Sequence, residues 1–249
     1  MPPLHFSTWG WIAIASGAFA IGLNKGGLAG FGLIPVLLFA FVFTPRVSTG
    51  IVLPLLIVGD IGAVIIYRRD VVWRVFWSFL PPALIGLVCG YLTMGRISEK
   101  AFGPLIGWII FALIGVQLVR GWLGAKIERV FLSRGFSLGM GVLTGITTMI
   151  ANAAGPVSNL YLLSIRLPKW DLIGTAAYLF FVINLCKIPF SAHLGLTNAY
   201  SLTLGAMLAP FVVAGFFLGR HAAGVMPQKA FDAFVLVCSA LGAVKLVFE

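Results

Sequence analysis

The stretch GLNKGGLAGFGLIPVLL, residues 22–38, decides how this chain folds. It interrupts the long apolar segment 7–43 with an asparagine, a lysine and a run of glycines, which disfavour an unbroken helix. A second stretch, NAAGPVSNLYLL at 152–163, interrupts the apolar segment 135–165 in a similar way. Each break leaves a second arm of about 10–15 residues, too short at 1.5 Å per residue to cross about 30 Å of hydrocarbon upright. The sequence therefore predicts two broken, re-entrant helices.

The composition places these segments in a membrane. Of 249 residues, 60% are hydrophobic and 10% are charged, whereas a soluble domain carries about 25% charged residues. Further apolar segments have the length of about 20 residues that a membrane-spanning helix needs. These segments are 46–67, 73–94, 101–120, 170–193, 199–219 and 228–247. The predicted fold is an all-α integral membrane protein.

The two breaks divide the chain into two halves of the same order. Asn24 and Asn152 are 128 residues apart, as are Gly27 and Gly155. Each half has a broken helix followed by three spanning segments, which is the pattern of an internal repeat. The predicted division is a first repeat at 1–122, a cytoplasmic linker at 123–134 and a second repeat at 135–249.

The basic residues predict how the halves face. If both broken segments crossed the membrane, the loops on each side would hold seven Lys and Arg residues. If each broken segment returns to its own side, one side holds eleven and the other holds three. The uneven split follows the positive-inside rule and explains the net charge of +10 without a nucleic-acid partner. Three crossings per half then invert the second repeat relative to the first, an arrangement known from transporters.

The two breaks are expected to face each other at the midplane and to bind a small anion between them. Half-helices are expected to start near Leu28 and at Pro156, with free N–H groups and the positive dipole end directed at the midplane. Glycines there permit close backbone approach, and Lys25 adds a positive charge. The predicted substrate-binding residues are Asn24, Lys25, Gly26, Gly27, Asn152, Gly155, Pro156, Ser158, Asn159 and Asn184, the last from the middle of its span.

Asp60 and Lys187 are further charged residues inside apolar segments. Asp60 is the only acid well within a span, so it is a candidate for coupling transport to protons or for a salt bridge with Lys25. Lys187 is expected to extend its ammonium toward the membrane surface. The scattered His and Cys residues have no metal-ligand spacing, and no catalytic constellation is present. We therefore expect no metal, no cofactor and no enzymatic activity.

The order of several motifs resembles the TauE/SafE sulfite exporter family. They are the two broken stretches quoted above, VVWR at 71–74, PPALIGLVCG at 81–90 and PFVVAGFFLGR at 210–220. The resemblance implies export of sulfite or organosulfonates such as sulfoacetate across a bacterial inner membrane. The inverted halves are expected to provide alternating access around a fixed site.

The expected partners are a small anion and the lipid bilayer. A coupled proton and a second copy of the chain remain open. The alternative function is a transporter of cations, metals or other small solutes, for which only Asp60 is available as an acidic ligand.

Overall fold

The computed structural model describes residues 6–94, 108, 111, 115 and 133–248, and these residues contain helices and turns but no strands. The predicted span 101–120 lies outside the described residues except at three positions. The predicted linker 123–134 lies outside them except at its last two residues.

The described helices follow the predicted segments closely. They are α1 (Thr8–Lys25), the short 3₁₀ helix η1 (Phe31–Leu33), α2 (Ile34–Val42), α3 (Pro45–Ile66), α4 (Trp73–Thr93), α6 (Arg134–Ala151), α7 (Ala154–Ser164), α8 (Lys169–His193), α9 (Ala199–Val225) and α10 (Gln228–Phe248). Among the described residues α3, from Val47, α4, α8 and α9 are long and apolar enough to cross a membrane. Helix α9 continues six residues past the predicted end at 219, through a segment that includes the strong helix formers Ala222 and Ala223.

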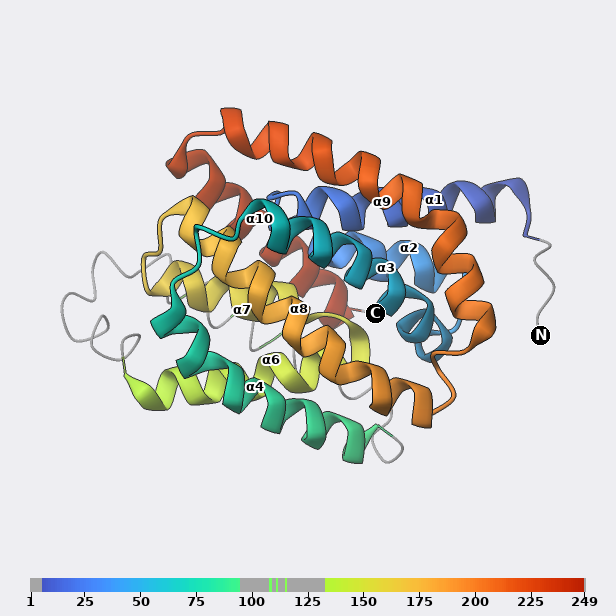
Figure 1. Ribbon diagram of the computed structural model, residues 1–249, viewed down its shortest axis with the longest axis horizontal. Helices are drawn as coiled ribbons and strands as arrows, with labels where there is room; N and C mark the ends of the chain where they lie inside the picture. Colours follow the sequence, from blue (N-terminus) through green and yellow to red (C-terminus); the bar gives the residue numbers. More distant parts are fainter. Residues whose placement is uncertain (1–5, 95–107, 109–110, 112–114, 116–132, 249) are drawn as a thin grey trace.

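The helices lie along the long axis of the molecule (Figure 1). Helices α1 and α9 pack together along one edge, α4 and α6 along the opposite edge, and α3 and α8 lie between these pairs. Helices α3 and α8 are antiparallel. Gly50 near the start of α3 packs against Leu196 beyond the end of α8, and the Val72 amide beyond α3 donates to Thr175 Oγ1 near the start of α8 over 3.0 Å.

Helices α1 and α2 form an antiparallel hairpin, which we call hairpin 1 (residues 8–42). At its base the rings of Phe6 and Phe43 are 5.4 Å apart. Farther along, Gly17 packs against the ring of Phe39. These contacts bring the second arm back along the first.

Helices α6 and α7 form a second antiparallel hairpin, hairpin 2 (residues 134–164). The Tyr161 hydroxyl donates to Ser137 Oγ over 3.0 Å, which joins the end of α7 to the start of α6. The reversal lies at Asn152, whose φ of 52° is left-handed. Asparagine enters this region more readily than most residues, so it suits the turn.

One packing pattern occurs in both halves. A Cβ added to Gly22 of α1 or to Gly145 of α6 would lie within 3.0 Å of three backbone atoms of a neighbouring helix. These atoms belong to Val212, Gly215 and Phe216 of α9 in the first case, and to Ala83, Gly86 and Leu87 of α4 in the second. Corresponding partners are 129 residues apart and the two glycines are 123 apart, so the two contacts match atom for atom.

The contacts correct the predicted alignment of the two hairpins. Gly32 and Gly155 pack against each other, and they are 123 residues apart, like Gly22 and Gly145. Asn24, by contrast, lies inside the last turn of α1, whereas Asn152 follows the end of α6. The 128-residue spacing therefore pairs residues that are not in equivalent positions.

Candidate functional site

A small cavity, with about 30 Å³ of space for a water-sized molecule, lies near the turn of hairpin 1. Most of its wall is apolar and comes from α8, with one residue from α3. Three polar side chains join this wall: Asn24 and Lys25 from α1 and Asn159 from α7. The apolar lining residues are Ala29, Ala63, Leu172, Ile173, Ala176, Ala177 and Phe180. A mostly apolar wall with a few convergent polar groups is typical of small-molecule sites.

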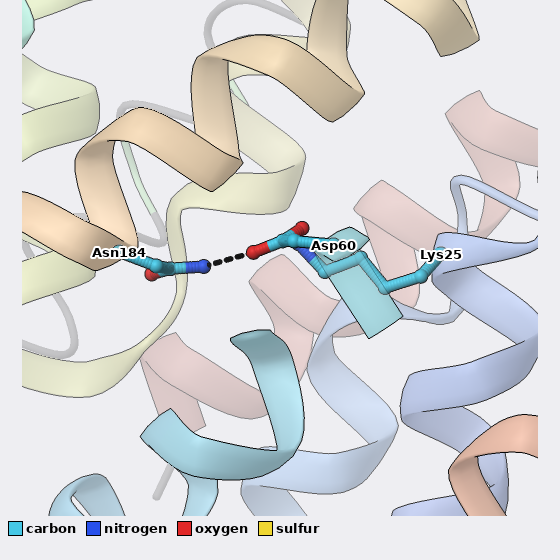
Figure 2. A network of polar contacts seen from close by, with 3 residues as sticks. All are labelled: Lys25, Asp60 and Asn184. Carbon is cyan, nitrogen blue, oxygen red and sulfur yellow. Dashed lines mark hydrogen bonds and ion pairs between the residues drawn. The ribbon is translucent and has the colours of Figure 1, made fainter. Parts of the chain in front are cut away.

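Lys25 is the charged residue of this cavity and is paired with Asp60. Its Nζ lies 2.5 Å from Asp60 Oδ1, and Asn184 Nδ2 donates to Asp60 Oδ2 over 2.6 Å. Figure 2 shows Asp60 of α3 between Lys25 of α1 and Asn184 of α8. The ammonium also lies 4.5 Å from the centre of the Phe180 ring, within the range of a cation–π contact. The predicted salt bridge is thus present, and it compensates the Lys25 charge in this structure.

The two hairpins touch beyond their turns. Asn159 Nδ2 of α7 donates to the Ala29 carbonyl over 2.7 Å, and a Cβ on Gly32 would lie 3.8 Å from the Cα of Gly155. The turns themselves lie at opposite ends of α3. The Tyr67 hydroxyl beyond α3 donates to the Gly26 carbonyl over 2.5 Å. At the other end Asn152 Nδ2 donates to the carbonyl of Thr49 over 3.2 Å.

The second arm of hairpin 1 starts later than the sequence predicted, and the second arm of hairpin 2 starts earlier. After the first break, η1 starts at Phe31 and not at Leu28. In hairpin 2, α7 starts at Ala154, so Pro156 is its third residue and not its first. The residue before α7, Ala153, provides no side-chain cap.

The glycines of the first break pack the turn onto α9. A Cβ on Gly26 would clash with the backbone of Phe216 and Arg220, and one on Gly27 would lie 2.8 Å from the Cβ of Ala223. Gly27 also has a φ of +129°, which side chains rarely permit. In this structure both glycines therefore serve close packing and the reversal of the chain.

The remaining predicted residues divide between the cavity and the fold. The Ser158 hydroxyl donates to the carbonyls of Ala154 and Gly155 in its own helix, at 3.0 and 3.2 Å. Asn152 belongs to the other turn, away from the residues that line the cavity.

Lys187 lies in the interior, which corrects the expectation that its ammonium extends toward the membrane surface. It is a candidate functional residue that the sequence did not reveal. It is fully buried and does not reach toward the surface. Its Nζ donates to the Thr148 carbonyl and to Asn152 Oδ1, each over 2.5 Å. Its position three residues after Asn184, on the same face of α8, is the signal that would have pointed inward.

Within the described part of the chain, no three His, Cys, Asp or Glu side chains come together in a way that could hold a metal ion. The charge at the cavity is instead an ammonium with its carboxylate partner.

Comparison with known families identifies the family of this chain. Residues 13–246, nearly the whole chain, match the family model described as Sulfite exporter TauE/SafE. Comparisons with curated proteins and with solved structures gave no match. The match covers hairpin 1 from residue 13 onward, the whole of hairpin 2 and all four candidate membrane spans of the described residues. The chain therefore belongs to the TauE/SafE sulfite exporter family of multi-pass membrane transporters.

Proposed function

We propose that this protein exports small sulfur-containing anions, sulfite or an organosulfonate such as sulfoacetate, across a bacterial inner membrane. The observation that carries the proposal is the Lys25 ammonium in the wall of the cavity at hairpin 1. This positive charge would repel a cation. The nearby carboxylate of Asp60 is already paired with the Lys25 ammonium. This arrangement favours an anion over the alternative cation or metal cargo.

The cavity suits a small oxyanion. Its space of about 30 Å³ is far below the range of about 300–1,000 Å³ for sites that hold drug-sized ligands, so only an anion of a few atoms fits without movement of the wall. Lys25 supplies the charge. The Asn24 amide oxygen is buried and has no partner among the described residues, so this amide is available to a ligand after rotation about its last bond. The apolar wall lowers the local dielectric constant and so strengthens the attraction between the ammonium and an anion.

The proposed topology is an inverted repeat. The bases of hairpins 1 and 2 lie near the starts of α3 and α8 respectively, and these two helices are antiparallel. In this proposal the hairpins enter the membrane from opposite sides, and both chain termini are outside. The basic loops 67–74, 166–169 and 220–229 then face the cytoplasm.

Alternating access follows from this symmetry. Two similar halves can exchange conformations around a fixed site, so the cavity opens first to one side and then to the other. A membrane that is negative inside favours the exit of a monovalent anion by about 2.3 kcal/mol per 100 mV. The anion therefore needs no coupled ion to leave.

Asp60 nevertheless gives the site a means of proton coupling. An anion that binds Lys25 competes with Asp60 for the same ammonium. A buried carboxylate that loses its cation is stabilised by taking up a proton. If Asp60 couples transport to protons, Asp60→Asn removes the dependence of sulfite flux on a pH gradient across proteoliposomes. An unchanged dependence would exclude this role.

Calorimetric titration of the purified protein with sulfite tests the binding site. Lys25→Met removes the ammonium and retains most of the apolar stem, so we expect sulfite affinity to fall at least about tenfold, or about 1.4 kcal/mol. Lys229→Met, which removes an exposed charge outside the cavity, is the matched control and should bind like the wild type. Equal affinity of Lys25→Met and wild type, or binding of divalent cations in place of anions, would contradict the proposal.

Labelling of single cysteines tests the topology. Arg69→Cys and Ala199→Cys place exposed thiols in the 67–74 and 193–199 loops, in a background without Cys89, Cys186 and Cys238. An impermeant thiol reagent should reach Ala199→Cys in intact cells and Arg69→Cys only after the membrane is opened. Labelling of both from the same side would reject the topology.

A further inference from the structure

We propose a second anion-binding site at Lys187, by the turn of hairpin 2, for the same small oxyanion that binds at Lys25. This inference rests on the proposed function and extends it from one binding position to two. Lys187 does not line the cavity, and its charge has no role in the site described above.

The two lysines occupy related places in the two halves. Hairpin positions correspond at a spacing of 123 residues, as shown by Gly22 and Gly145, so Lys25 corresponds to Thr148. Lys187 Nζ contacts the carbonyl of that same Thr148. Each half therefore brings one ammonium to the end of its first arm, from the hairpin itself in the first half and from α8 in the second.

The relation between α3 and α8 leads to the same position. These helices start 124 residues apart, and Asp60 bonds to Asn184, the residue 124 positions later. At this spacing Lys187 corresponds to Ala63, which lines the cavity of the first half. The Lys187 side chain thus occupies in the second half the region that is hollow in the first.

The charges of the two lysines differ in how they are compensated. In the described part of the chain the Lys25–Asp60 contact is the ion pair of the interior, and Lys187 contacts two neutral oxygens. The residue equivalent to Asp60 is the neutral Asn184, so the second half lacks the acid. The carbonyl end of α6 offsets part of the charge, but an isolated buried ammonium remains costly. A bound anion would supply the missing negative charge.

The closed state of this position agrees with alternating access. Lys187 is fully buried and its contact with Asn152 holds the hairpin 2 turn against α8, whereas hairpin 1 has an open cavity. When the halves exchange conformations, the turn of hairpin 2 separates from Lys187 and exposes the ammonium. An anion released from Lys25 would then bind Lys187 on its way to the other side.

Calorimetry with sulfite separates a ligand site from a structural lysine. Lys187→Gln keeps an amide that can donate to Thr148 and Asn152 but removes the charge. We expect Lys25→Met to bind sulfite at least tenfold more weakly than wild type and the double variant Lys25→Met/Lys187→Gln to bind none. Lys187→Arg in the Lys25→Met background keeps the charge and should retain the residual binding. Lys187→Met serves as a second neutral variant if the glutamine variant does not fold.

The outcomes distinguish this inference from the proposed function. If Lys25→Met retains no binding, or if the residual binding survives Lys187→Gln, there is no second site at Lys187. Wild-type protein that binds none of sulfite, thiosulfate and sulfoacetate would overturn the proposed function and this inference together.

Discussion

The ends of the two hairpins share a scaffold and differ in charge. At hairpin 1 the lysine belongs to the hairpin, is paired with Asp60 and lines an open cavity. At hairpin 2 the lysine belongs to α8, is buried and, among the described residues, contacts two neutral oxygens. The glycines that pack the helices are repeated in both halves, whereas the charged residues are not. Close helix packing therefore constrains both halves alike, while each half carries its own polar groups.

The difference has an energetic consequence. Removing one partner of a buried ion pair leaves an uncompensated charge, which costs more than the net stabilisation that the intact pair provided. Removing a lone buried charge leaves no such partner behind. The two ends should therefore respond differently to the loss of one charged group.

The largest effect is expected for Asp60→Ala. This substitution leaves Lys25 buried without a carboxylate and should lower the free energy of unfolding by about 3–5 kcal/mol. Lys187→Gln, which removes the charge at the other end, should cost much less. Denaturant titration of the detergent-solubilised proteins measures both, and equal losses would mean that the two ends do not differ in this way.

A smaller and equal effect is expected for Gly22→Ala and Gly145→Ala. Each added Cβ meets the backbone of the neighbouring helix, so each should cost about 1–3 kcal/mol of unfolding free energy. Gly139→Ala on α6 is the matched control, because no atom of the described residues lies within 4 Å of its added Cβ. A loss at one of the two glycines without a comparable loss at the other would contradict the repeated packing.

Asn159→Ala tests the link between the hairpins. The variant leaves the Ala29 carbonyl without its donor and should destabilise the protein by about 1–2 kcal/mol. Faster hydrogen exchange at the start of hairpin 1's second arm should accompany the loss. If neither quantity changes, this hydrogen bond does not hold the hairpins together.

The smallest effect is expected for Ser158→Ala. Its hydroxyl donates only to carbonyls of its own helix, which accept backbone hydrogen bonds as well. We expect a change below about 0.5 kcal/mol in stability and unchanged sulfite affinity in calorimetry. A large drop in affinity would place Ser158 at the bound anion after a rearrangement of α7.

The fold was predictable from the sequence where local chemistry decides it. Apolar lengths located the spans, and the runs around Gly27 and Asn152 located the reversals, because few residues adopt a positive φ. The correspondence between the halves was not predictable from the sequence. The contact between Gly155 and Gly32 arises from three-dimensional packing, and the spacing of similar residues in the sequence does not indicate it. The partners of Lys25 and Lys187 likewise depend on which helices become neighbours. Asp60 was identified as a partner only because it is the sole acid deep in a span, whereas neutral partners such as Thr148 give no such signal.

Sulfite efflux from proteoliposomes measures directly whether Lys25 holds an anion for export. With a potential negative inside, wild-type vesicles should release sulfite faster than empty vesicles, and Lys229→Met should match wild type. Vesicles with Lys25→Met should lose most of this release while the protein remains folded. Undiminished release by Lys25→Met would contradict the account.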